Sequence, residues 1–186
     1  MSRKYKIRDQ ERPYFVTFTV INWIDVFIRN EYRNIFIDSV KFCQQNKGLE
    51  VYAYCIMTSH VHMIIGSNGQ NPLEGIIRDL KSFTSRSIRK VLENGMELNE
   101  SRKEWMLWMM QRAGKQNINN NDYQFWQQDN QPVELYSDAF IKQKLEYLHN
   151  NPVEAGFVKS PELWHYSSCA DYYGTDKGSI DLLYLE

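Results

Sequence analysis

The sequence has little of what defines several common protein classes. Its 186 residues include only three cysteines, which are far apart and odd in number: Cys43, Cys55 and Cys169. They match neither a disulfide framework nor paired zinc knuckles, so we expect free thiols in a reducing cytoplasm. No segment has the apolar length needed to cross a bilayer, and the first residues lack the apolar run of a signal peptide. These features predict a cytoplasmic protein without a membrane span.

The net charge is also small, at −1, and does not by itself indicate a nucleic-acid-binding protein. The charges are nevertheless unevenly distributed. Basic side chains crowd the N-terminus and the segment 78–90, whereas acids gather towards the end of the chain. Such a chain can present one basic face to phosphates while staying near neutral, although a solvated helix face is the alternative. The candidate DNA-phosphate contacts are Arg78, Lys81, Arg86 and Arg89.

Apolar residues make up 42% of the chain and aromatic residues 14%, which suits one compact globular domain. We therefore expect a single domain over residues 1–186. Its polar ends, residues 1–12 and 175–186, are expected to be flexible tails, and residues 96–122 have the character of an insertion.

The order of the predicted elements indicates the fold class. Alternating Phe, Val and Thr predict a strand over 14–20, and apolar residues at helical spacing predict a helix over 31–46. Two strands joined by a tight turn follow over 49–67, and a second helix extends over 71–94, with Asn71 as its N-cap. A short strand is expected at 123–126. This order predicts an α+β, ferredoxin-like (RRM-like) sandwich, in which helices cover one face of an antiparallel sheet and the other face is free for a ligand.

The predicted insertion contains an unusual helix. Ser101 and Glu104 have the spacing of a capping box, and the run from Trp105 to Met110 is apolar without a break. A helix that is apolar all round must be buried by its own domain, by a second subunit or around unpaired bases. The run slightly favours a homodimer over a monomer. Three side chains could stack on unpaired bases, with core packing as the alternative: Trp105, Trp108 and Trp126.

The second strand of the predicted hairpin carries a metal-binding pattern. His60 and His62 are two residues apart, so both imidazoles project from one face while Val61 points to the other. If Val61 points to the core, the histidines lie on the free face. Two neutral imidazoles side by side make half of a divalent-metal site, with two solvated polar residues as the alternative. The rest of the chain must then supply a third ligand.

A helix near the end of the chain carries polar groups on one face. Ser137 is its predicted N-cap. Its apolar stripe consists of Ile141, Leu145 and Leu148. Tyr147 lies beside that stripe, on the same face as Lys144 and Asn151.

The end of this helix is also predicted. Pro152 disfavours helical geometry in the residue before it, so we expect the helix to end at or just before Asn151. His149 is two residues from Tyr147, nearly opposite it on the helix, and is expected at the surface.

Two longer motifs carry a resemblance to a known family. The first is Met57-Thr-Ser-His-Val-His-Met-Ile-Ile65, and the second is Tyr147-Leu-His-Asn-Asn-Pro-Val-Glu-Ala-Gly156. Shorter matches are Lys81-Ser-Phe-Thr84, Phe125-Trp-Gln127 and the stretch 161–168. On these residues the chain resembles the single-tyrosine HUH transposases, most closely the REP-associated tyrosine transposases, over about residues 12–170.

The resemblance implies metal-dependent cutting and rejoining of single-stranded DNA with hairpin-containing ends, on a ferredoxin-like fold. It implies that Tyr147 is the nucleophile and that His60 and His62 bind the metal. Asn151 occupies the place, one turn after the tyrosine, where relatives carry a Gln or Asn that completes the metal shell. Many relatives read Pro-Asn-His where this chain has Thr-Ser-His60, a change that affects the turn and not the ligands.

This chemistry has simple physical requirements. A divalent cation, Mg²⁺ or Mn²⁺, withdraws negative charge from the phosphate and fixes the geometry for in-line attack. Attack by Tyr147 would leave the 5′ phosphate on tyrosine and free a 3′ hydroxyl, and the reversal needs no ATP. The sequence accordingly has no phosphate-cradling glycine loop. Lys144, one turn before the tyrosine, is a candidate support for the phenolate, with a solvated lysine as the alternative.

Two other functions stay open on the sequence. One is a domain of the same fold that binds single-stranded nucleic acid without cutting it. The other is a metal-dependent nuclease in which water attacks and Tyr147 is a bystander. The active site could also be built within one chain or shared between two.

Overall fold

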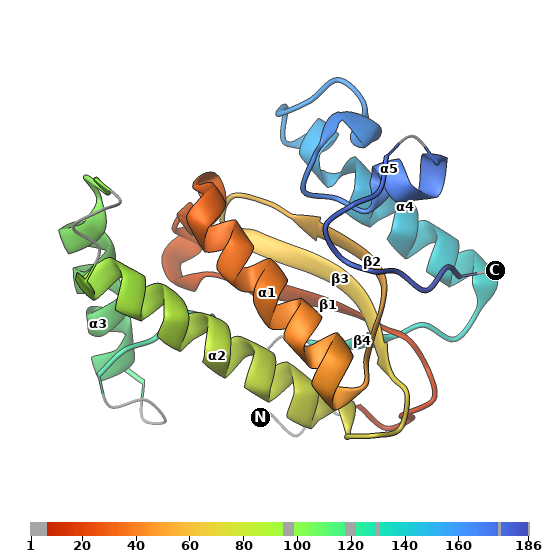
Figure 1. The fold of residues 1–186 in the computed structure, drawn as a ribbon, viewed down its shortest axis with the longest axis horizontal. Helices are drawn as coiled ribbons and strands as arrows, with labels where there is room; N and C mark the ends of the chain where they lie inside the picture. The colour runs from red at the N-terminus through yellow and green to blue at the C-terminus, as the bar shows by residue number, and fades with distance from the viewer. Residues whose placement is uncertain (1–6, 95–98, 118–121, 129–130, 175, 186) are drawn as a thin grey trace.

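The computed structural model describes residues 7–94, 99–117, 122–128, 131–174 and 176–185. These residues form a four-stranded sheet with helices packed on both of its faces (Figure 1). With η marking a 3-10 helix, the elements in chain order are β1 (Tyr14–Thr19), η1 (Ile21–Trp23), η2 (Val26–Ile28), α1 (Asn30–Lys47), β2 (Leu49–Ile56), β3 (His60–Ser67), α2 (Leu73–Asn94), α3 (Lys103–Lys115), β4 (Val133–Glu134), α4 (Asp138–Glu154), η3 (Pro161–Leu163) and α5 (Cys169–Tyr173).

The sheet is antiparallel and has the strand order β2-β3-β1-β4. Along the chain the elements follow the order strand, helix, two strands, helix and a last strand. Together with the strand order of the sheet, this forms the predicted ferredoxin-like α+β sandwich. The sequence did not predict β4, because a two-residue strand leaves too short a pattern to detect. The strand predicted over 123–126 is wrong, since this segment forms only an isolated bridge between Val20 and Trp126.

Alternate residues of β3 belong to two separate cores. Val61, Met63 and Ile65 are fully buried in the cluster formed with α1 and α2. Ile64 points to the opposite side, where it packs with Leu148 of α4. The prediction that two helices share one face is therefore confirmed for α1 and α2, and α4 is the added helix on the other face (Figure 1). We call these sides the α1/α2 face and the α4 face.

The ends of α1 and α2 join the two helices to other parts of the chain. Gly48 ends α1 with a left-handed φ of 74°, a conformation that glycine adopts without a Cβ clash. At the start of α2, the Gln10 side chain accepts a hydrogen bond from the Leu73 N–H at 2.8 Å. The Asn71 side chain instead donates to the Lys47 carbonyl, so the predicted N-cap is replaced by a residue from the N-terminal segment.

Both segments expected to be flexible tails have packed portions. Ile7 is buried in the core of the α1/α2 face, although residues 1–6 lie outside the described residues. At the other end Ile180 is buried, and the Leu183 N–H donates to the Val51 carbonyl at the edge of the sheet. Each of these two segments therefore has at least one residue that packs on or bonds to the rest of the domain, while most of its other side chains are exposed or half-exposed.

Helix α3 is amphipathic rather than buried all round. Met106 and Met110 are fully buried, whereas Trp105 and Trp108 are 49% and 52% exposed. The predicted capping box is wrong, because α3 begins at Lys103 and no side chain caps it. Trp126, by contrast, is only 6% exposed and packs in the core.

Helix α4 begins as predicted and ends later. The Ser137 side chain caps it by accepting a hydrogen bond from the Phe140 N–H. The helix then continues through Pro152 to Glu154, so the prediction that it ends at Asn151 is wrong. Proline removes only its own N–H from the helix, and the Ala155 N–H still donates to the Asn151 carbonyl at 3.0 Å.

The predicted surface position of His149 is also wrong. Its side chain is buried, and its Nε2 lies 2.9 Å from the Ser168 hydroxyl. The Ser168 hydroxyl also accepts a hydrogen bond from the Tyr54 N–H and thus links the segment after α4 to β2. That segment covers the side of α4 opposite Tyr147, which a helical-wheel argument on α4 alone cannot anticipate.

Two further findings bear on the sequence expectations. Cys43, Cys55 and Cys169 are buried, free thiols. None of the helices within the described residues combines the length and apolar character of a membrane span.

Candidate active site

His60 and His62 project together from the α4 face of β3, as their two-residue spacing predicts. Their ring centroids are 4.8 Å apart, and Val61 between them is buried in the opposite core. β3 is paired with β1 on one side and β2 on the other, so the sheet fixes the backbone that carries both rings. The arrangement brings two imidazole nitrogens to one place on a rigid support.

His62 is held in a defined orientation by β1. The register sets Thr17 opposite His62, and the Thr17 hydroxyl lies 2.9 Å from His62 Nδ1. Phe15 of the same strand stacks on the imidazole with a centroid separation of 5.4 Å. Burial, with smaller contributions from the charges of His60 and Lys144, lowers the pKa of His62 to about 3. The ring is therefore neutral near pH 7, as a metal ligand must be.

The partner of the second ring nitrogen is Asn151 of α4. Its amide Nδ2 lies 3.3 Å from His62 Nε2. With the amide in this orientation, Nε2 accepts and the ring proton resides on Nδ1, facing the Thr17 hydroxyl. In either amide orientation, Nε2 faces the space shared with Asn151.

His60 lies at the start of β3, beside two polar neighbours and one aromatic ring. Burial lowers the pKa of His60, while a hydrogen bond with Asn151 and the charge of Asp25 act in the opposite direction. Trp23, from the turn after β1, meets the imidazole edge-to-face at a centroid separation of 5.4 Å. Asn151 therefore contacts both histidines, and Trp23 forms the outer side of the site.

Tyr147 reaches the histidines from α4. Its ring lies edge-on to His62 at 5.4 Å and to Phe15 at 5.9 Å. The side chain is 51% exposed, so the phenol is accessible from solvent. Lys144 Nζ lies 5.6 Å from the centroid of the tyrosine ring, on the same face of the helix. The structure thus brings together, within one chain, the residues that the sequence placed in two distant motifs.

The donors at this position suit a divalent cation of the Mg²⁺ or Mn²⁺ type. They are two neutral imidazoles and, if the amide of Asn151 is rotated by half a turn, one amide oxygen. No group of three His, Cys, Asp or Glu side chains within the described residues has the spacing of a metal site, so the third protein donor here would be the amide. A site of this kind leaves coordination positions for phosphate oxygens and water.

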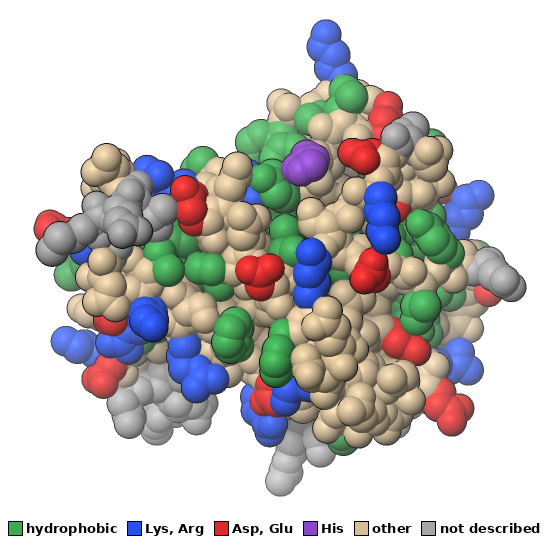
Figure 2. Space-filling model, viewed as in Figure 1, with side chains coloured by type: hydrophobic (Ala, Val, Ile, Leu, Met, Phe, Trp, Pro, Cys, Tyr) green, Lys and Arg blue, Asp and Glu red, His purple; other side chains and the backbone are tan. Residues whose placement is uncertain are grey.

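The basic residues predicted to contact DNA are not beside the histidines. All four lie on α2, which packs against the opposite face of the sheet: Arg78, Lys81, Arg86 and Arg89. Two of them form ion pairs with acidic neighbours on the same helix, Arg78 with Asp79 and Arg89 with Glu93. Figure 2 shows that basic and acidic side chains are interspersed on the α1/α2 face rather than separated by sign. Their DNA contacts stay a prediction.

Three residues of the site were not found from the sequence. Thr17 and Phe15 lie on the same side of β1, and only the register with β3 brings them to His62. Trp23 follows a strand in a turn of two left-handed residues, a geometry that leaves no periodic signal. Alternation in β1 places Phe15 and Thr17 on one face, but nothing in the sequence specifies their partner.

Residues 14–128, which are more than half of the chain, match the family model described as IS200-like transposase. The chain therefore belongs to the IS200-like transposase family and is an enzyme of DNA transposition. The matched residues include His60, His62 and Thr17 and end before α4, so Tyr147 and Asn151 lie outside them.

The solved structures that are similar to this chain include two transposases. The first is the REP-associated tyrosine transposase bound to a REP hairpin, with 14% identity and a TM-score of 0.66, covering 100% of this chain and 94% of that chain. At this identity the likeness shows the fold. The second is a candidate transposase from Deinococcus radiodurans, with 17% identity and coverages of 81% and 95%, whose TM-score of 0.42 is too low to support an argument. No curated protein sequence matches the chain.

Proposed function

We propose that this transposase cuts and rejoins single-stranded DNA in a metal-dependent reaction, with Tyr147 as the nucleophile. The observation that carries the proposal is the position of Tyr147, whose half-exposed ring lies 5.4 Å from the imidazole of His62. A tyrosine that only packed against the sheet would be buried, as Tyr14 and Tyr54 are. Exposure beside two neutral imidazoles instead suits a group that meets a phosphate.

The metal ligands in this proposal are His60, His62 and Asn151. The low pKa of His62, caused chiefly by burial, keeps its ring uncharged, and the Thr17 contact with Nδ1 directs Nε2 towards the cation position. A bound Mg²⁺ or Mn²⁺ would withdraw negative charge from the non-bridging phosphate oxygens. The hard oxygen donor and the imidazoles fit both ions, and we propose no choice between them.

The proposed reaction is a transesterification. The Tyr147 hydroxyl oxygen forms a bond to phosphorus while the bond from phosphorus to the 3′ oxygen breaks. The tyrosine loses its proton, the 3′ oxygen gains one, and the 5′ phosphate remains on the tyrosine. Lys144, with its ammonium 5.6 Å from the tyrosine ring centroid, would add positive charge near the phenolate as it forms. Reversal with another 3′ hydroxyl rejoins the strand.

We infer that the DNA substrate is a strand with hairpin-containing ends. Support comes from the solved relative of the same fold, which is bound to a REP hairpin. We also infer that one chain suffices for the chemistry, since Tyr147 and the histidines of the same chain are in contact. A homodimer, expected from the apolar run at 105–110, stays a prediction.

The proposal is tested by mixing the protein with a labelled, hairpin-containing oligonucleotide and Mn²⁺, then separating products on a denaturing gel. Wild-type protein is expected to form a covalent adduct that Tyr147→Phe abolishes. Tyr136→Phe is the matched control, because Tyr136 is also an exposed tyrosine, 69% accessible, and precedes the same helix. Cutting that survives Tyr147→Phe would identify a water-using nuclease. Binding without any cutting would identify a DNA-binding domain.

A further inference from the structure

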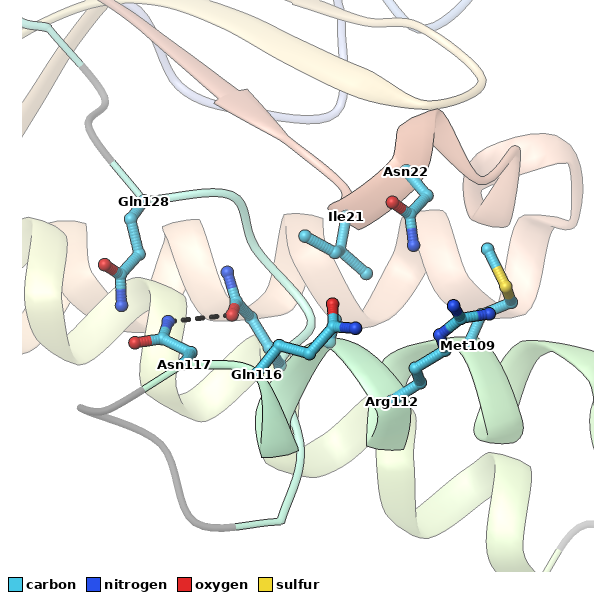
Figure 3. Close-up of a pocket in the computed structure, with 9 residues that line it drawn as sticks. Ile21, Asn22, Met109, Arg112, Gln116, Asn117 and Gln128 are labelled. Atoms are coloured by element: carbon cyan, nitrogen blue, oxygen red, sulfur yellow. Dashed lines mark hydrogen bonds between the residues drawn. The ribbon is translucent and has the colours of Figure 1, made fainter.

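A cavity of about 670 Å³ lies between the turn after β1 and helix α3 (Figure 3). Nine described residues line it, and none of these belongs to the proposed metal site. They are Ile21, Asn22, Met109, Arg112, Ala113, Gln116, Asn117, Gln124 and Gln128.

The lining combines an apolar floor with several amides. Figure 3 shows these amides on three different segments along the cavity, with Gln128 at one end, Asn22 at the other and Gln116 between them. Across the described parts of the chain, the structure gives these three amides no hydrogen-bond partner. The buried Gln124, by contrast, is fixed by bonds to Asn117 and to the Trp126 carbonyl. The side chains of Asn22, Gln116 and Gln128 are all exposed, so their donors and acceptors face solvent beside the apolar side chains of the lining and are open to a ligand.

The described lining is mainly polar and carries a single positive charge. Arg112 is the one charged residue among the nine that line the cavity. Its guanidinium lies over the Trp108 ring at 5.4 Å from the centroid. Amides with a single arginine match the hydrogen-bonding edge of a nucleobase, and apolar side chains match its faces.

The turn after β1 connects this cavity to the histidines. Asn22 and Trp23 are consecutive residues with left-handed φ angles of 53° and 55°. That conformation is uncommon for asparagine and strained for tryptophan, and such strain concentrates at functional sites. The turn directs Asn22 into the cavity and sets Trp23, which is 58% exposed, against the ring of His60. One two-residue turn thus borders both sites.

We propose that the cavity binds an unpaired base of the DNA strand whose phosphate is held at His60 and His62. The proposal rests on the proposed function for the position of that phosphate. The strand passes over Trp23, on which a neighbouring base stacks, and the next base enters between η1 and α3. There amides of the lining bond to its edge, and Arg112 lies at the rim.

The test measures binding without cutting. Tyr147→Phe protein, which lacks the proposed nucleophile, is titrated in the presence of Mn²⁺ into two fluorescent single strands of equal length, one of mixed sequence and one made of abasic sites, and anisotropy is recorded. Removing two amides with the double substitution Gln116→Ala and Gln128→Ala is expected to weaken binding of the mixed strand by about 10-fold or more. Binding of the abasic strand should change by less than about 2-fold, because phosphate contacts persist.

Two further variants sharpen the test. Asn22→Gly removes the amide while allowing the left-handed backbone, so it should also weaken binding of the mixed strand selectively. Gln111→Ala is the matched control, because Gln111 is an exposed glutamine of α3 outside the cavity lining. Unchanged binding in the cavity variants, equal losses on both strands, or a Tyr147→Phe parent that does not distinguish the strands would overturn the inference.

These outcomes are independent of the nicking reaction. If the cavity variants lose affinity only for the mixed strand but the wild-type protein forms no covalent adduct, the base pocket is supported and the proposed transesterification is rejected. If the wild-type protein forms the adduct but the cavity variants show no selective loss of affinity for the mixed strand, the transesterification is supported and the pocket is rejected.

Discussion

The two faces of the sheet use the same strands for different purposes. On the α1/α2 face, Val61, Met63 and Ile65 of β3 are fully buried among apolar side chains of α1 and α2. On the α4 face, His60 and His62 alternate with them and meet the half-exposed Tyr147. The α4 helix covers this face only in part, with Leu148 packed against the sheet and Tyr147 beside it.

The difference between the faces suggests a separation of roles. Burial of apolar area on the α1/α2 face stabilises the fold, and the α4 face gives up part of that burial to expose polar groups. Because strand residues alternate, a substitution at one position of β3 acts on one face alone. A substitution on the α4 face should therefore lower mainly the rate of adduct formation, and one on the α1/α2 face should lower mainly the free energy of unfolding.

The largest expected effect is loss of reaction on the α4 face. His60→Ala removes one proposed metal ligand and should lower the rate of Mn²⁺-dependent adduct formation by more than about 100-fold, since even partners of metal ligands are worth 10–100-fold. His60 is only half-buried at the start of β3, so the free energy of unfolding should change by less than about 1 kcal/mol. Adduct rates and urea unfolding measure the two quantities. An active His60→Ala protein would show that His60 is not a ligand.

The matched substitution on the other face should reverse this pattern. Met63→Ala leaves a cavity in the core under α1 and α2 and should lower the free energy of unfolding by about 2–5 kcal/mol. Adduct formation per folded molecule, measured well below the unfolding transition, should stay close to wild type. A large loss of rate in folded Met63→Ala protein would show that the two faces are coupled.

A smaller effect is expected where β1 supports the metal site. Thr17→Val removes the hydroxyl that lies 2.9 Å from His62 Nδ1 and keeps the side-chain shape. The affinity for Mn²⁺, measured by calorimetry on DNA-free protein, should fall by about 10–100-fold because the imidazole loses its orienting partner. Adduct formation at saturating Mn²⁺ should recover most of the wild-type rate.

Thr19→Val is the control for this substitution. Thr19 lies two residues further along β1 and faces His60 in the register, yet no hydrogen bond joins their side chains in the described structure. The Mn²⁺ affinity of the Thr19→Val protein should differ from that of the wild type by less than about 2-fold. Equal losses in both variants would indicate a general disturbance of β1 instead of a specific contact.

These expectations depend on features that were predictable to different degrees. The shared face of His60 and His62 follows from the period of a strand, and the shared face of Tyr147 and Asn151 follows from the period of a helix. Each is a local rule, and each holds in the structure. The histidine face of β3 meets the Tyr147 face of α4 only because of the way α4 crosses the sheet. The family resemblance implied this contact, whereas no local sequence pattern could predict it.

The wrong predictions share a physical cause. His149 was assigned to the surface from the geometry of α4 alone, and it is buried because Ser168 and its neighbours cover that side of the helix. Trp105 and Trp108 do not pack in the core, which was one of the alternatives for them, and they are half exposed because α3 contacts the domain along one stripe only. Burial is decided by which distant segment arrives, and sequence periodicity describes only the segment itself.

The smallest predicted effect concerns the link between α3 and the turn that carries Trp23. The Glu100 side chain is almost fully buried. Its carboxylate accepts two hydrogen bonds from Arg102, of 3.0 and 2.9 Å, and forms an ion pair with Arg29 at 2.9 Å. Arg102 also donates to the Asp25 carbonyl, next to the segment that borders His60. Glu100→Gln should lower the free energy of unfolding by about 1.5 kcal/mol at pH 7, the lower end of the range for hydrogen bonds to charged groups.

The pH dependence identifies the cause of this loss. Hydrogen bonds from Arg102 hold the pKa of Glu100 below its ordinary value of 4.5. A carboxylate with a lowered folded-state pKa stabilises the protein above 4.5, and that stabilisation is lost as the pH falls through the folded-state pKa. The difference between wild type and Glu100→Gln, measured by urea unfolding from pH 7 down to pH 3, should therefore shrink below about pH 4. A difference that stays constant over this range would mean that packing, and not the charge of Glu100, joins α3 to the turn beside His60.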